Sequence, residues 1–88
     1  MDKKIGFIGC GNMAKAMIGG IIGAHFVEPS RVYASDPSLE SLDEIRDSFD
    51  INTTTDNIAV ARECDLVILA VKPHLYEGVI TQIKDDIN

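Results

Sequence analysis

A glycine-rich turn near the start of the chain holds the residues best suited to chemistry. Residues 9–14 read GCGNMA, which fits the pattern G-x-G-x-x-A. Gly9 suits a tight turn from a strand into a helix, and Gly11 lacks the Cβ that would hold a pyrophosphate away from the backbone. Ala14 lets the helix pack close to the strand. The free N–H groups of the first helical turn would face the phosphates, so this pattern predicts a dinucleotide site.

The segments on both sides of the turn support this hypothesis, since a lone glycine pattern is common in loops. Residues 5–8 are an apolar stretch that predicts a buried strand, and residues 12–24 carry apolar residues at helical spacing. Gly19, Gly20 and Gly23 in this helix predict a close approach of its backbone to the sheet. The alternative is a glycine turn between a strand and a helix that binds no ligand.

An acidic residue follows the second expected strand, residues 31–35. Asp36 comes 25 residues after Gly11. A carboxylate at this place accepts hydrogen bonds from an adenosine ribose and repels a 2′-phosphate, so Asp36 favours NAD(H) over NADP(H). The alternative is that Asp36 caps the next helix, with Pro37 at the first helical position. Ser35 and Ser38 are candidate donors to a phosphate, which leaves NADP(H) open.

Strands and helices are predicted to alternate along the whole chain. The expected strands are residues 5–8, 31–35, 51–54 and 65–71, and the expected helices are residues 12–24, 39–49, 57–63 with Thr55 or Asp56 as N-cap, and 76 onward. This order with short connections predicts the α/β class, as a doubly wound parallel sheet with strand order 3-2-1-4 and helices on both faces. The run 65–71 is the most apolar of the chain and the best candidate for a central strand.

The expected topology brings two separate segments to one crevice. Ligands of doubly wound sheets bind outside the carboxyl ends of the strands, where the strand order reverses. In this chain that place lies between Gly9–Gly11 and Ala70–Pro73. His74 stands beside this crevice, although a loop histidine is more often a bystander than an acid or base.

Composition narrows the classes of protein and partner. The 88 residues are 45% hydrophobic and carry a formal net charge of −6, which predicts one soluble domain and argues against a nucleic-acid partner. The longest unbroken apolar stretch, residues 16–24, is too short to span a membrane, and no secretory signal is evident. We therefore expect a cytoplasmic protein with free thiols at Cys10 and Cys64. The sequence has no spacing typical of a metal site, a serine hydrolase or a P-loop.

Three segments together resemble a known enzyme family over all 88 residues. They are KKIGFIGCGNMAKAMIGG at residues 3–20, ASDPS at 34–38 and DLVILAVKPH at 65–74. They are similar to the N-terminal, Rossmann-type domain of pyrroline-5-carboxylate reductase, the last enzyme of proline synthesis. The resemblance implies an oxidoreductase that reduces 1-pyrroline-5-carboxylate to L-proline with a hydride from NADPH or NADH.

The resemblance also implies roles for individual residues in cofactor binding. The pyrophosphate would be held by Gly9, Gly11, Asn12, Met13 and Ala14, the adenosine ribose by Ser35, Asp36 and Asn57, and the nicotinamide half by Ala70, Val71, Lys72 and Pro73. Asp36 departs from members that have a small polar residue there, and it favours NADH. No catalytic residue and no metal ion are expected on this chain.

Members of the family continue into a helical C-terminal domain that dimerises and supplies most of the substrate site. The resemblance therefore implies that residues 1–88 are the N-terminal domain of a homo-oligomeric protein and are inactive alone. With that domain missing, self-association through the exposed edge of the fourth strand is expected. Two alternatives stay open. One is a stand-alone NAD(H)-sensing module in which no hydride moves, and the other is the cofactor domain of a related hydroxyacid dehydrogenase.

Overall fold

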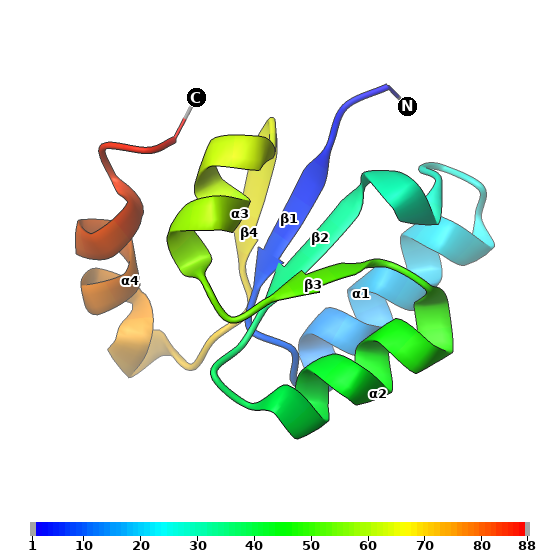
Figure 1. The fold of residues 1–88 in the computed structure, drawn as a ribbon, viewed down its shortest axis with the longest axis horizontal. Coiled ribbons are helices and arrows are strands. Elements are labelled where there is room, and N and C mark those ends of the chain that lie inside the picture. Colours follow the sequence, from blue (N-terminus) through cyan, green and yellow to red (C-terminus); the bar gives the residue numbers. More distant parts are fainter. Residues whose placement is uncertain (1, 88) are drawn as a thin grey trace.

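The computed structural model describes residues 2–87 and shows a parallel four-stranded sheet between two pairs of helices (Figure 1). The elements in chain order are β1 (Ile5–Ile8), α1 (Asn12–Gly23), the 3₁₀ turn η1 (Pro29–Arg31), β2 (Val32–Ser35), α2 (Leu39–Phe49), β3 (Asn52–Thr54), α3 (Asn57–Glu63), β4 (Leu66–Leu69), the 3₁₀ turn η2 (Pro73–Leu75) and α4 (Tyr76–Ile83). The strand order is β3-β2-β1-β4, and all neighbours are parallel. The predicted fold class and strand order are confirmed.

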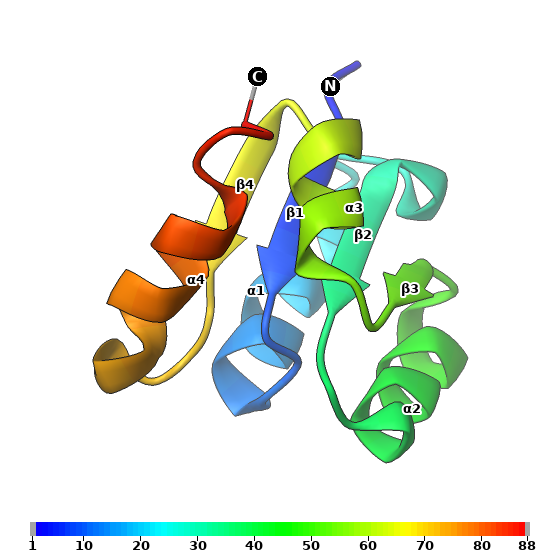
Figure 2. The same cartoon turned by 60° about the vertical axis from the view of Figure 1, so that its left-hand side comes forward.

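The helices cover both faces of the sheet because successive side chains of β1 point to opposite sides. Figures 1 and 2 show α1 and α2 on one face and α3 and α4 on the other. Phe7 packs with Ile18 and other residues of the α1–α2 face, and Ile8 packs with Ile83 and other residues of the α3–α4 face. All four residues of β1 are buried, so this strand forms the centre of the core.

The close contacts between helices and sheet occur at other small residues than expected. A Cβ added at Gly6 of β1 would lie 2.4 Å from Val60 Cγ1, so this glycine lets α3 pack tightly on the strand. The prediction for the glycines of α1 is wrong, since an added Cβ at Gly20 or Gly23 meets nothing within 4 Å, and one at Gly19 lies 3.4 Å from the Phe49 ring of α2 and meets no atom of the sheet. The face of α1 that packs on the sheet carries Ala14 and Ile18, whereas Gly20 and Gly23 are exposed.

The most apolar strand is not central in the part of the chain that the structure describes. β4 pairs only with β1 and forms one edge of the sheet. Leu66 is 48% exposed, and the other residues of β4 are half-buried. The prediction that this strand is central was wrong. A run of apolar residues indicates that both faces of a strand are buried, but it does not indicate that the strand has a hydrogen-bonded neighbour at both edges.

The N-termini of α2 and α3 are each capped by the side chain of the N-cap residue. Ser38 is the N-cap of α2 and its Oγ accepts from Ser41 N at 3.2 Å, so the alternative that Asp36 caps this helix is wrong. Asp56 is the N-cap of α3 and accepts from Ile58 N at 2.9 Å, as predicted. Among residues 2–87, no helix has the length and apolar character needed to cross a membrane.

Candidate functional site

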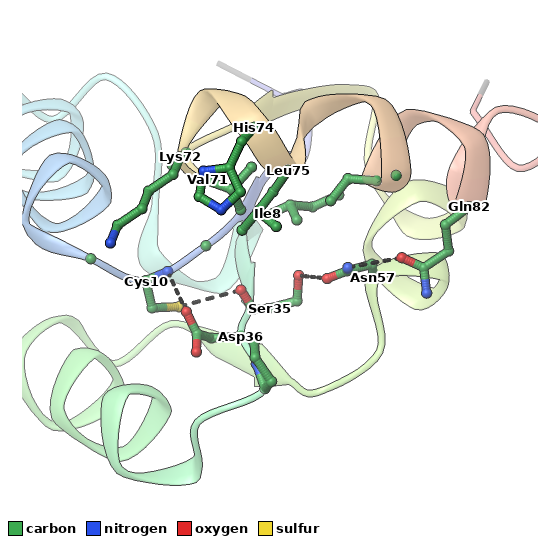
Figure 3. Close-up of a pocket in the computed structure, with 16 residues that line it drawn as sticks. Ile8, Cys10, Ser35, Asp36, Asn57, Val71, Lys72, His74, Leu75 and Gln82 are labelled. Carbon is green, nitrogen blue, oxygen red and sulfur yellow. Dashed lines mark hydrogen bonds between the residues drawn. The ribbon is translucent and has the colours of Figure 1, made fainter.

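A cleft of about 570 Å³ opens at the carboxyl ends of β1 and β4, where the strand order reverses (Figure 3). Its walls come from the glycine turn, the ends of β2 and β4, the first residue of α3, and one side of η2 and α4. The lining residues are Ile8, Gly9, Cys10, Gly11, Ser35, Asp36, Pro37, Asn57, Ala70, Val71, Lys72, His74, Leu75, Gly78, Val79 and Gln82. The structure thus brings the segments of the predicted crevice together.

Gly9 lets the chain turn sharply out of β1 between two neighbouring strands. Its φ of +109° is a conformation that L side chains rarely adopt. Its N–H donates to Ser35 O at 2.7 Å, and an added Cβ would lie 2.6 Å from Ala70 O. The fold itself therefore requires glycine at this position.

Gly11 begins α1 in a very different environment. It is the N-cap of the helix with φ of −78°, no side chain caps the helix there, and no acidic residue lies in the first turn. An added Cβ would meet nothing within 4 Å. The first N–H groups of a helix need partners from outside it, and they attract anions. The start of α1 therefore fits a phosphate group that approaches the backbone closely.

Asp36 joins the glycine turn to the β2–α2 connection. Its Oδ2 accepts from Cys10 N at 2.9 Å, and its Oδ1 accepts from Ser38 N at 2.9 Å. Because both oxygens accept from backbone N–H groups, the carboxylate has a fixed place at the rim of the cleft (Figure 3). The sequence suggested Asp36 as a ribose ligand or a helix cap, and gave no signal for this contact with the turn.

Cys10 contributes its backbone to the cleft and its side chain to the core. The residue is 1% exposed, and its Sγ donates to Ser35 O at 3.6 Å. Burial, and secondarily the negative charge of Asp36, raises the pKa of the Cys10 thiol to about 11. Burial likewise raises the pKa of the Cys64 thiol to about 11. As predicted, Cys10 and Cys64 carry thiols and are not joined in a disulfide, and these thiols stay protonated near neutral pH.

A chain of polar side chains closes the α3–α4 end of the cleft. Ser35 Oγ donates to Asn57 Oδ1 at 2.6 Å, and Asn57 Nδ2 donates to Gln82 Oε1 at 3.0 Å (Figure 3). Ser35 is fully buried, so its hydroxyl is not exposed to a ligand. We correct the expectation that its side chain contacts the cofactor, since the β2 end points this hydroxyl at Asn57 instead.

The remaining predicted site residues differ in their relation to the cleft. Asn12 and Met13 lie exposed in the first turn of α1, beside the lining residues, whereas Ala14 is fully buried and packs in the core. Ala70, Val71 and Lys72 line the cleft, and Pro73 begins η2 outside the lining. Within the described chain, no group of three or more His, Cys, Asp or Glu residues is placed to hold a metal ion.

The sequence interpretation missed the contribution of α4 to the cleft. Leu75, Val79 and Gln82 recur at spacings of four and three, which places them on one side of a helix. Gln82 is the polar member of this set. A polar residue on an otherwise apolar helical stripe was the signal that could have found it.

The fold and the cleft define a Rossmann-type, dinucleotide-binding class of α/β domain. A family model described as "NADP oxidoreductase coenzyme F420-dependent" matches residues 4–88. The chain belongs to this family.

Relatives with more specific names match all or nearly all of this chain. Pyrroline-5-carboxylate reductase of Escherichia coli (strain K12) is 40% identical over 88 residues, which are 100% of this chain and 33% of that protein. The structure of a pyrroline-5-carboxylate reductase from Coxiella burnetii has a TM-score of 0.91 at 38% identity, over 97% of this chain and 31% of that one. The Plasmodium falciparum enzyme, crystallised with NADP bound, has a TM-score of 0.81 at 30% identity, over 96% of this chain and 29% of that one. The chain thus spans about a third of the length of these relatives.

Proposed function

We propose that this chain binds the dinucleotide cofactor of an NAD(P)H-dependent oxidoreductase that reduces 1-pyrroline-5-carboxylate to L-proline. The start of α1 carries the proposal, because its uncapped N-terminus and the open space at Gly11 face the cleft. The relatives named pyrroline-5-carboxylate reductase support the choice of reaction.

Three groups of residues around the cleft are proposed to bind three different parts of the cofactor. The pyrophosphate lies at Gly9 and Gly11 and against the backbone N–H groups of the next residues, Asn12, Met13 and Ala14. The adenosine ribose lies between Asp36 and Asn57, which face the cleft from β2 and α3. The nicotinamide half lies along the segment from Ala70 to Pro73, which follows β4. When bound, the cofactor supplies the hydride, and this chain orients it.

The choice between NADH and NADPH depends on Asp36. Its carboxylate cannot turn away easily from a 2′-phosphate, because Cys10 N and Ser38 N hold its two oxygens. The proposal therefore favours NADH. The family description and the NADP-bound relative point to the phosphorylated cofactor, so this residue is the right one to test.

The test compares the dissociation constants of NADH and NADPH for the wild-type chain and for Asp36→Ser. Losing the contact with Cys10 N weakens both cofactors alike, so the ratio of the two constants isolates the effect of the charge on the 2′-phosphate. We expect the preference to move at least about tenfold towards NADPH, as removal of a nearby like charge predicts. Asp47→Ser, on the exposed side of α2, removes the same charge outside the cleft and serves as the control. An unchanged ratio of the two dissociation constants in Asp36→Ser would contradict the proposal that Asp36 binds the adenosine ribose.

The reaction requires more than this chain. No residue of the cleft is assigned a catalytic role, and we expect no turnover of 1-pyrroline-5-carboxylate with the 88 residues alone. Oxidation of NADH is measured by absorbance with the substrate present. Sustained, substrate-dependent oxidation of NADH by this chain would contradict the proposal that it only binds and orients the cofactor.

A further inference from the structure

Three polar side chains from three different elements form one directed hydrogen-bond chain in the cleft. Ser35 ends β2, Asn57 begins α3, and Gln82 lies near the end of α4. The donors run in one direction, from Ser35 Oγ to Asn57 Oδ1 and from Asn57 Nδ2 to Gln82 Oε1 (Figure 3). All three residues line the same cleft.

The direction of this chain decides which atoms remain for a ligand. An asparagine or glutamine amide has an acceptor side and a donor side of nearly equal shape. In the observed direction, Asn57 uses its oxygen towards Ser35 and keeps one N–H, and Gln82 keeps its amide NH₂. In the reverse direction, Asn57 would donate to Ser35 and accept from Gln82. The observed direction therefore leaves the spare N–H of Asn57 on the side of Gln82, whereas the reverse direction would place it on the side of the buried Ser35 and leave Gln82 with a free acceptor oxygen.

Residue 82 is the outer end of the chain, and Gln82 accepts from Asn57 there, so the donors and acceptors available at this position decide which directions are open. Ser35 is fully buried and can act either as donor or as acceptor, so it does not select a direction by itself. A residue at position 82 that only accepts enforces the observed direction, and one that only donates enforces the reverse.

We propose that Gln82 is a positioning residue for the adenosine ribose. It holds the amide of Asn57 so that an N–H of Asn57 is available to a ribose oxygen in the cleft. The inference rests on the proposed dinucleotide function, and it assigns to α4 a part in recognising the adenosine half of the cofactor.

The test uses three substitutions that differ in what residue 82 can donate or accept. Gln82→Glu only accepts, Gln82→Lys only donates, and Gln82→Met does neither at similar length. These residues have similar helix propensity, and position 82 is exposed, so the variants should fold. Thr81→Glu, Thr81→Lys and Thr81→Met make the same changes at an exposed neighbour that does not line the cleft. Urea unfolding midpoints verify that each variant is folded.

The first readout is affinity for NADH and for two of its parts, ADP-ribose and nicotinamide mononucleotide. Relative to its Thr81 control, Gln82→Met should bind NADH and ADP-ribose three- to tenfold more weakly, and Gln82→Lys at least as weakly. Gln82→Glu should stay within twofold of its control. Binding of nicotinamide mononucleotide should not change, because that part lies at the other end of the cleft. Equal affinities for ADP-ribose in all three variants and their controls would overturn the inference.

The second readout follows Asn57 without any ligand. Its two side-chain amide protons are identified in a ¹⁵N–¹H spectrum by their loss in Asn57→Asp. Gln82→Met should move these signals and speed their exchange with water, whereas Gln82→Glu should keep the bonded proton. Signals that are identical in wild type and Gln82→Met would also overturn the inference. If the wild-type chain binds no dinucleotide, the proposed function fails and the ribose role of Gln82 fails with it; if it does bind, unaffected variants overturn only the role of Gln82.

Discussion

Gly9 and Gly11 lie two residues apart in one turn, yet the structure surrounds them differently. At Gly9, an added Cβ would lie 2.6 Å from Ala70 O, and the positive φ of +109° already disfavours a side chain. At Gly11, φ is −78° and an added Cβ would meet nothing within 4 Å. The fold of the described residues explains the first glycine. A ligand that approaches the backbone explains the second.

The helix N-termini also differ in whether residues of the fold satisfy their backbone N–H groups. α2 and α3 each begin at a residue whose side chain accepts from a backbone N–H of its own helix. α1 begins at Gly11 without such a cap, and Gly11 lines the cleft. α4 also lacks a side-chain cap, but it continues directly from the 3₁₀ turn η2 and has the acidic Glu77 in its first turn, whereas the first turn of α1 has no acidic residue. The N-cap side chains of α2 and α3 thus bond to backbone N–H groups of their own helices, whereas the first N–H groups of α1 are left without a capping side chain beside the cleft.

The largest effect is expected from Gly9→Ala. The new Cβ meets backbone atoms of Ala70 and needs an unfavourable φ, so the free energy of unfolding should fall by about 2–5 kcal/mol. Cofactor binding should be lost with the geometry of the turn. Urea denaturation measures the first effect. A variant as stable as the wild type would mean that the turn can adopt another conformation.

Gly11→Ala should separate binding from folding. Its Cβ enters open space at an ordinary φ, and alanine is only a poorer N-cap than glycine, so the free energy of unfolding should fall by about 1 kcal/mol or less. The same Cβ stands where the pyrophosphate would approach, and we expect affinity for NADH to fall about tenfold or more, or about 1.4 kcal/mol. A titration followed by calorimetry measures it. Unchanged affinity for NADH would contradict the proposal that Gly11 lets the pyrophosphate approach the backbone.

The thiols of Cys10 and Cys64 make the stability sensitive to alkaline pH. Burial raises the pKa of both to about 11 in the folded chain, above the ordinary value of 9.0. Folding therefore favours the protonated thiols, and the stability they contribute is complete below pH 9 and is lost as the pH rises towards 11. Urea midpoints between pH 8 and 11 should fall more in the wild type than in the Cys10→Ala/Cys64→Ala variant. Parallel curves for the two proteins would contradict this account.

A smaller effect is expected from Ser38→Ala, which tests a helix start that serves only the fold. Removing the Oγ that accepts from Ser41 N should lower the free energy of unfolding by about 1 kcal/mol. Affinity for NADH should not change, because Ser38 does not line the cleft. A clear loss of affinity in a folded Ser38→Ala variant would show that α2 also takes part in binding.

The sequence predicted the parts of this molecule that depend on local pattern. Alternation of apolar strands with amphipathic helices was sufficient for the strand order, and the spacing of small residues in the turn was sufficient to locate the cleft. Asp56 was recognisable as a cap because capping depends on residues close in the chain.

Most of what the sequence interpretation missed concerns contacts between segments distant in sequence. The pairing of Asp36 with Cys10 N spans 26 residues, and that of Ser35 with Asn57 spans 22. Neither follows from periodicity, because each depends on how the ends of two elements meet in space. The edge position of β4 was missed for a similar reason, since hydrophobicity reports burial of faces and not the number of paired edges.

The most direct test of the central claim is a ¹⁵N–¹H spectrum of this chain titrated with NADH and, separately, with NADPH. The account predicts that the backbone amide signals of residues 11–14 move with increasing ligand, together with those of Asp36 and Asn57. The amides of Ser41 in α2 and Ile58 in α3 donate to capping side chains and do not belong to lining residues, so they should move far less. Saturating shifts confined to other surfaces, or no shifts at residues 11–14 with either cofactor, would contradict the claim that the open start of α1 is a phosphate-binding site.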